Sequence, residues 1–316
     1  MPQPLHIASL HHYPLKSAQG ISLTHAQMNR LGLEQDRRWV LIDDDGNFLS
    51  QRTCAAMGAI HVDAYEQMLT ISLHGQTHQA FANPAHLVAA TVWGDHVESC
   101  FAVQPEIDTW LTSELRISVR LVYCPETAIR VVDEHYAGVG HRTAFSDGFP
   151  LLVISQSSLD ELTRQWGAPI DLRRFRPNLI VGGDCEPFAE DQWRSIRIGD
   201  AIFDLIKPCS RCVIPSLDPD TQQPTDGFLK FLATSRRKAD GKVYLGQNAV
   251  LRHTSHSIDH GFIDNRLTSD AISHSQSLAQ SLSLLHTKKE HVKNAANFEH
   301  FSQPILTVGQ EIWVES

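Results

Sequence analysis

The sequence has no apolar run long enough to cross a bilayer, and its start lacks the charged and apolar regions of a secretory signal. Positive charge is also in short supply, since 27 Lys and Arg face 36 Asp and Glu and give a formal net charge of -9. Proteins that bind nucleic acid or anionic membranes usually carry a surplus of cations. We therefore expect a cytoplasmic protein with neither kind of partner, in which any anion site is built locally.

Cysteine is scarce as well. Six cysteines are spread over 316 residues without a secretory context, which argues against a disulfide framework. We expect reduced thiols, of which one or two are functional.

Apolar runs of strand length dominate the pattern, and the chain is long enough for two domains. Helix is expected only after the first 120 residues, at 155–166, where a Ser-rich start and a following Gly mark the ends, and in a further short segment at 228–237. The fold class that this pattern predicts is mainly β with a few helices (α+β). Strands are expected at 7–10, 39–42, 69–73, 87–93, 178–181, 195–198, 201–206 and within 305–314.

Between about 252 and 302 the composition changes to Ser, His, Asn and Lys with a weak apolar stripe. We interpret this segment as a polar insertion that carries one amphipathic helix. Its His253, His256 and His260 could form a secondary metal site, although a solvated loop is the default interpretation.

The sharpest chemical signal is the segment Lys-Pro-Cys-Ser-Arg-Cys-Val-Ile-Pro, residues 207–215. A zinc site would need a second Cys or His pair at standard spacing, and none follows. A thioredoxin-like redox pair would open a helix, whereas Pro215 and an Asp-Pro-Asp turn come next. Two structural cysteines at a strand end stay open as a third interpretation. A single thiolate metal ligand is favoured, because Lys207 and Arg211 stabilise an ionised thiol.

Several cations of this acidic chain stand beside Pro, Gly or aromatic residues in expected turns. Arg suits bidentate recognition of phosphate, and Lys with Ser can add point contacts. Each of these cations alone is more often a solvated surface charge, but their joint occurrence favours an anion site. They are Lys16, Arg37, Arg38, Arg52, Arg173, Arg174 and Arg176.

The order of these motifs resembles the MOSC-domain family with its N-terminal β-barrel partner domain, from about residue 5 to 250 and again from 305. Within the family, the sequence resembles bacterial proteins that reduce N-hydroxylated bases and the mitochondrial amidoxime-reducing component. The resemblance implies two β-barrel-like domains, 1–122 and 123–316, that share a cofactor cleft. It is carried by Tyr-Pro-Leu-Lys-Ser (13–17), Asp-Arg-Arg-Trp (36–39), Ser-Asp (146–147), Phe-Arg-Pro-Asn (175–178), Lys-Pro-Cys-Ser-Arg-Cys (207–212), Asp-Pro-Asp (218–220), Gly-Gln-Asn (246–248) and Thr-Val-Gly (307–309).

Residue by residue, the resemblance implies that Cys212 is the ligand of molybdenum in a molybdopterin cofactor and that Arg211 assists it in catalysis. Cys185 matches a second cysteine that is not a ligand, and the role of Cys209 is open. The remaining matches are cofactor contacts: Lys16 and Ser17 at the phosphate, Arg37 at the phosphate or pterin, Ser146 and Asp147 in a pocket loop, Arg176 and Asn178 beside the pterin, and Ser210 with Arg211 beside the metal.

The implied activity is the reduction of hydroxylaminopurines, hydroxylamines or amidoximes by removal of oxygen at molybdenum. Some relatives carry a ferredoxin module with cluster-binding cysteines that are missing here, so no intrinsic iron-sulfur cluster is expected. The electrons would come from a separate ferredoxin, flavoprotein or flavodoxin. Pyridoxal phosphate is not expected, because the lyase portion of cofactor sulfurases is missing. Two alternatives are a carrier of the cofactor or of sulfur and a zinc-stabilised β-domain that binds a partner protein.

Overall fold

The computed structural model describes residues 3–252 and 303–316. The polar insertion, with its expected amphipathic helix and the site at His253, His256 and His260, lies outside the described residues. Among those described, no helix combines the length and the apolar character needed to span a bilayer.

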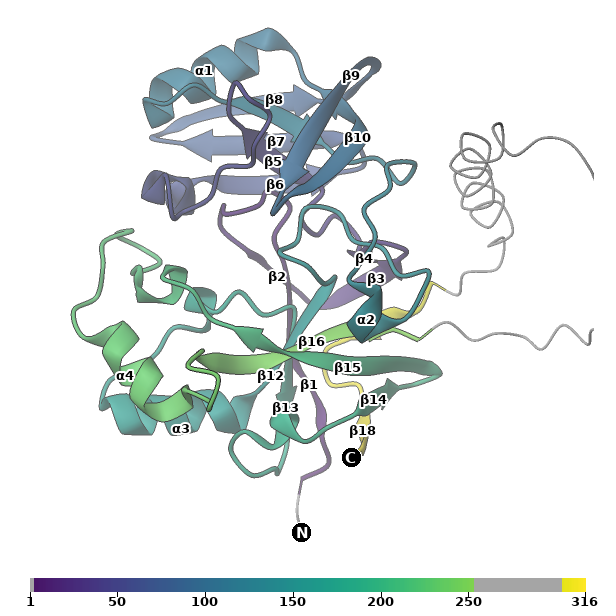
Figure 1. The fold of residues 1–316 in the computed structure, drawn as a ribbon, viewed down its shortest axis with the longest axis vertical. Coiled ribbons are helices and arrows are strands. Elements are labelled where there is room, and N and C mark those ends of the chain that lie inside the picture. The colour runs from purple at the N-terminus through teal and green to yellow at the C-terminus, as the bar shows by residue number, and fades with distance from the viewer. Residues whose placement is uncertain (1–2, 253–302) are drawn as a thin grey trace, which may run out of the picture. The chain divides into compact units, whose positions relative to one another are not determined.

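Strands are the commonest regular structure of the described chain, and four α-helices accompany them (Figure 1). This confirms the α+β class. The strands are β1 (His6–His12), β2 (Ile21–Leu23), β3 (His25–Asn29), β4 (Gly32–Leu33), β5 (Trp39–Ile42), β6 (His61–Tyr65), β7 (Met68–Leu73), β8 (Gln76–Phe81), β9 (Asn83–Val92), β10 (Asp95–Ala102), β11 (Arg120–Tyr123), β12 (Leu151–Ser155), β13 (Leu179–Gly182), β14 (Ser195–Ile198), β15 (Ala201–Ser210), β16 (Tyr244–Leu251), β17 (Ile305–Thr307) and β18 (Ile312–Glu315). The helices are α1 (Pro105–Leu115), α2 (Glu134–Ala137), α3 (Gln156–Trp166) and α4 (Phe228–Arg236).

The largest sheet has eight strands in the order β18-β14-β15-β16-β12-β13-β1-β2. Its third strand, β15, leads into the cysteine motif, and β1 comes from the start of the chain (Figure 1). Because β1 pairs with β13, the segment after His12 runs beside residues 175–178: the backbone N–H of His11 donates to the carbonyl of Asn178, and the Tyr13 hydroxyl donates to that of Pro177. The sheet thus brings together motifs that are more than a hundred residues apart.

Three smaller sheets have the strand orders β5-β11-β10-β9, β6-β7-β8 and β17-β3-β4, and none of the sheets formed by the described residues closes into a barrel. The expectation that helix enters only after residue 120 is wrong, because α1 precedes it. Gln104 at its N-cap makes no side-chain cap, although Pro105 and the acidic Glu106 and Asp108 of the first turn are start signals that the sequence offers. Burial of Ile107, Leu111 and Leu115 in the core shared with β7 and β11 stabilises the helix instead.

The two expected helices are both present and support the second half of the chain. Ser155 caps α3 by accepting a hydrogen bond from the N–H of Ser158, and Gly167 ends it at φ +78°. Trp166 of α3 packs on Phe228 of α4, with ring centroids 5.4 Å apart. Phe175 is buried in the same cluster, which fixes the backbone that carries the arginines on either side of it.

Candidate functional site

One cleft, with about 820 Å³ of empty space, collects every residue that the sequence predicted for the site. Sequence segments near residues 16, 37, 146, 176 and 211 all contribute to its lining. Their roles toward a cofactor stay predictions. The predicted residues in the lining are Lys16, Ser17, Arg37, Ser146, Asp147, Arg176, Asn178, Ser210, Arg211 and Cys212.

Three of these residues adopt a left-handed backbone conformation that is uncommon outside glycine. The φ angles are +70° for Ser17, +48° for Arg37 and +56° for Arg176. Such a conformation costs on the order of 1–3 kcal/mol and persists only where its surroundings hold it. Here the N–H of Arg37 donates to the carbonyl of Tyr13 at 2.9 Å. Strained residues gather at ligand sites, which supports a functional role for this cluster.

Tyr13 lies between two guanidinium groups. The Arg37 guanidinium carbon is 4.4 Å and that of Arg176 is 4.2 Å from the ring centroid. Burial, together with the charge of Arg37, lowers the pKa of Arg176 to about 10. Nη1 of Arg176 donates to the carbonyl of Ala18, whereas its buried Nη2 has no hydrogen-bond partner among the described residues. Because Asp36 already pairs with Arg37 at 2.6 Å, an anion beside this stack would chiefly supply an acceptor to the unpaired Nη2 of Arg176.

Lys16 and Asp147 form an ion pair at the cleft wall. The ammonium donates to Oδ1 of Asp147 at 2.5 Å and to the carbonyl of Phe145 at 2.9 Å, and the lysine side chain is 7% exposed against 65% for the aspartate. Burial lowers the pKa of Lys16 to about 8, although Asp147 opposes this shift. Enclosure in the cleft would raise the pKa of Asp147, but the charge and hydrogen bond of Lys16 hold it well below its usual range. A buried lysine with an exposed carboxylate as partner can exchange that partner for another anion.

Arg130, which the sequence analysis did not single out, holds the loop that carries Ser146 and Asp147. Its Nη1 donates to the carbonyls of Ala144 at 2.9 Å and Ser146 at 2.6 Å, and its Nε donates to Asp95 at 3.0 Å. The side chain is only 2% exposed. Nothing in its sequence surroundings marks this role, because the carbonyls that it binds lie far along the chain.

Asn178 lines the cleft but its polar atoms bind within the protein. Oδ1 accepts hydrogen bonds from Arg37 and from the N–H of Leu152, and Nδ2 donates to the carbonyl of His11. The residue is buried. Its geometry therefore fits a residue that positions Arg37 and the adjoining strands.

The cysteine motif leaves β15 at Ser210 and turns into the cleft, where both Cys209 and Cys212 lie. Arg211 donates through Nη1 to the sulfur of Cys209 at 3.1 Å and through Nη2 to the carbonyl of Phe175 at 2.7 Å. Its buried Nε has no partner in the described part of the chain. Arg211 thus contacts the sulfur of Cys209, and Cys212 keeps its thiol free of side-chain hydrogen bonds from the described residues.

Cys185 does not line the cleft and lies instead beside the hydroxyl of Ser157 at the start of α3, 3.2 Å away. Within residues 3–252 and 303–316, no three side chains of His, Cys, Asp or Glu gather as metal ligands. The zinc alternative therefore has no ligand set in that part of the chain.

The cleft also contains residues that were not predicted for it. Arg52 was noted among the isolated cations and Asn248 within the Gly-Gln-Asn motif, and these were the available signals. The Arg52 guanidinium lies over the ring of Trp93 at 4.7 Å, and the Trp93 indole donates to Asp147 at 3.2 Å. Phe149 lies in the stretch Phe-Ser-Asp-Gly-Phe-Pro (145–150) that carries the predicted Ser146 and Asp147, but nothing in the sequence singled out this residue itself.

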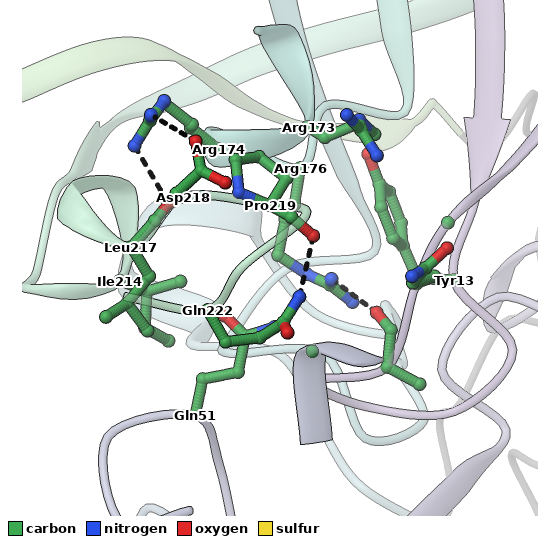
Figure 2. A pocket seen from close by; sticks show the side chains of 14 residues that line it. Tyr13, Gln51, Arg173, Arg174, Arg176, Ile214, Leu217, Asp218, Pro219 and Gln222 are labelled. Carbon is green, nitrogen blue, oxygen red and sulfur yellow. Dashed lines mark hydrogen bonds and ion pairs between the residues drawn. The ribbon is translucent and has the colours of Figure 1, made fainter. Parts of the chain in front are cut away.

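A smaller pocket shares Arg174, Arg176 and Ile214 with the cleft (Figure 2). Arg174 donates to the carbonyl of Leu217 and to Asp218, as Figure 2 shows, so its charge is paired. The unpaired donor at this wall belongs to Arg176. Arg176 lines both pockets, whereas Lys16, Arg37 and Arg211 line the larger cleft and not the smaller pocket.

Comparison with known proteins gives this fold and cleft a context. Residues 5–118 match the model of the MOSC N-terminal beta barrel domain, and residues 140–261 match that of the MOSC domain. The chain is 31% identical to the mouse mitochondrial amidoxime-reducing component 1 over 68% of its own length and 66% of that protein. It is 28% identical to the rice molybdenum cofactor sulfurase over 77% of its length, which spans 32% of the rice protein.

Among solved structures, the YUAD protein of Bacillus subtilis matches 79% of this chain and 91% of its own, at 11% identity and a TM-score of 0.34. A likeness at that level adds nothing to the strand order described above. The fold and cleft define an α+β protein that gathers a cysteine pair and buried cations in one pocket. Given the two matching domain models, the chain belongs to the MOSC-domain family, and its curated relatives connect it to molybdenum-cofactor function.

Proposed function

We propose that this protein binds molybdenum with molybdopterin and reduces N-hydroxylated compounds such as hydroxylaminopurines, hydroxylamines and amidoximes. The observation that carries the proposal is the meeting of the free Cys212 thiol with buried cations in one cleft. The name of the mouse relative, an amidoxime-reducing component, supports the choice of substrate.

The donors of the cleft fit an anionic cofactor. Nη2 of Arg176 and Nε of Arg211 are buried without partners among the described residues, which costs about 1–3 kcal/mol each until an acceptor arrives. Lys16 has an exposed carboxylate as its partner, which a phosphate can replace. A thiolate at Cys212 suits a metal of intermediate softness.

In the bound state Lys16, Ser17 and Arg37 would hold the phosphate, and Arg176 with Asp147 would contact the pterin. Asn178 would keep Arg37 in place, and Ser210 and Arg211 would flank the metal ligand Cys212. The molybdenum would supply the two-electron chemistry at an oxygen bonded to nitrogen, and the protein supplies binding, orientation and electrostatics. We further propose that a separate ferredoxin, flavoprotein or flavodoxin delivers the electrons, and that the cleft is shared by domains 1–122 and 123–316.

The test uses protein made in cells that synthesise the cofactor, with molybdenum measured by mass spectrometry and pterin by the fluorescence of its oxidation products. We expect both to be present, and turnover of a hydroxylamine with a chemical reductant. Cys212→Ser should abolish turnover while the circular dichroism spectrum stays native. Cys209→Ser is the matched control, because Cys209 lines the same cleft.

If Cys209→Ser abolishes turnover and Cys212→Ser does not, the ligand is the other cysteine. Protein that contains neither molybdenum nor pterin contradicts the proposal. A carrier of the cofactor or of sulfur, the alternative that the rice sulfurase match supports, would contain molybdenum but reduce no hydroxylamine.

A further inference from the structure

The cleft has an aromatic border that the proposed cofactor contacts do not use. Phe149 lines the cleft together with Cys212, and Tyr136 stands edge-on to Phe149 with ring centroids 6.4 Å apart. Tyr136 is 42% exposed. It belongs to α2, which packs on β15, the strand that leads into the cysteine motif (Figure 1).

Lys207 completes this border. Its ammonium lies 3.9 Å from the ring centroid of Tyr136 and 5.8 Å from that of Phe149. Within the described residues no carboxylate pairs with it. On β15 it precedes Cys209 by two positions and pairs with Asn248, which also lines the cleft. The cation therefore stands at the margin of the cleft on the cysteine side.

We propose that Tyr136, Phe149 and Lys207, here called the aromatic rim, recognise the ring of a planar, uncharged aromatic substrate while its N–O group enters the cleft. This inference rests on the proposed function and adds a recognition site to it. Stacking of a planar base on an exposed aromatic side chain contributes about 1–3 kcal/mol of binding free energy per base. A flat heteroaromatic ring is thus the chemical group that this rim fits.

Lys207 adds selection by charge. An amidoxime is a weak base and is neutral near pH 7, whereas the amidine that its reduction leaves is a strong base and carries a proton. An unpaired ammonium repels that cation and does not repel the neutral substrate. For amidoximes the rim therefore favours binding of the substrate and release of the product, whereas an uncharged aminopurine such as adenine is not repelled.

The first test measures binding without turnover. Adenine, which is planar, uncharged and not reducible, is titrated into the full-length holoprotein by calorimetry. We expect Tyr136→Ala and Phe149→Leu to weaken adenine binding about fivefold to a hundredfold, with recovery in Tyr136→Phe. Tyr65→Ala is the matched control, because Tyr65 is 67% exposed on β6 and outside the cleft. If wild type and Tyr136→Ala bind adenine with equal affinity, or if adenine does not bind at all, the proposed role of the aromatic rim is wrong.

The second test is kinetic. In Tyr136→Ala the ratio of KM for an N-hydroxylated purine to KM for hydroxylamine should rise by the same factor, because hydroxylamine has no ring to stack. In Lys207→Gln, inhibition by benzamidine, a cationic aromatic product, should become stronger while KM for benzamidoxime changes less. A loss of kcat shared by all substrates would mark the rim as merely structural. If adenine binding depends on Tyr136 but the protein reduces no substrate, the proposed function is contradicted and the recognition role of the aromatic rim is retained.

Discussion

The cations of the cleft differ in pKa, and Lys16 is the one among them that loses its charge near neutral pH. Its pKa is lowered to about 8, so the ammonium is charged below that pH and loses its proton above it. Anion binding that depends on Lys16 should therefore be strong below pH 8 and weaken as the pH rises through 8. Sulfate is a suitable probe, because its own charge is constant over this range.

Titration of sulfate by calorimetry between pH 6.5 and 9.5 would show this loss. In Lys16→Arg the charge persists, so the decline near pH 8 should disappear. A wild-type affinity that is flat across the range would contradict the assignment of Lys16 as an anion contact.

Arg130 makes a second residue-scale prediction. Arg130→Met should lower the free energy of unfolding by about 1–3 kcal/mol, because three acceptors lose their buried donor. It should also weaken sulfate binding, since the loop of Asp147 is released. Urea unfolding gives the first quantity, with Arg164→Met as control: Arg164 is exposed and its ion pair with Glu161 is expected to contribute about 0–1 kcal/mol. Equal losses in both variants would argue against the role of Arg130.

At this scale the sequence indicated which residues line the site but not how they are paired. Lysine and arginine beside turn residues can be recognised in the sequence, so Lys16, Arg37 and Arg176 could be predicted as members of the site. The sequence could not show that Arg211 contacts the sulfur of Cys209, because partner choice depends on side-chain geometry after folding. Arg130 was missed for the same reason.

At the scale of elements, the connection between β1 and β2 depends on one close contact. A Cβ added to Gly20 would lie 2.3 Å from Cε1 of Tyr13, whose ring is fixed between two guanidiniums. Gly20→Ala should therefore cost about 1–3 kcal/mol in unfolding free energy and disturb sulfate binding. Gly148→Ala is the control, because its added Cβ meets no atom within 4 Å. An alanine at position 20 that leaves the urea midpoint in place would contradict this packing argument.

Short elements whose ends are marked by turn residues were predictable. Elements whose ends depend on strand pairing or on buried contacts were not. β5 and β14 match their expected ranges, since flanking Asp and Gly residues stop the apolar runs. β15 continues past its apolar part to Ser210 because β16 pairs with it across two irregular registers. α1 was missed although Pro105 and two acidic residues mark its first turn, because Gln104 makes no side-chain cap and buried contacts stabilise the helix.

At the scale of the whole molecule, the strand order was not readable from the sequence. β1 lies between β13 and β2 in the eight-stranded sheet, so a cut at residue 122 separates it from β13. A fragment of residues 123–316 should lack cooperative urea unfolding alone and regain it when mixed with residues 1–122. Circular dichroism would measure both states. An isolated fragment that unfolds at the midpoint of the full chain would contradict this dependence.

The paired guanidiniums on Tyr13 also bear on the lifetime of the protein in a cell. The buried Nη2 of Arg176 has no partner among the described residues, which disfavours the ligand-free form, and an anion bound beside the two guanidiniums would lower the free energy of the folded protein. Chains made when the cofactor is short should then open more often and be degraded sooner than loaded ones. The amount of this protein would thereby follow the supply of the molecule that it binds.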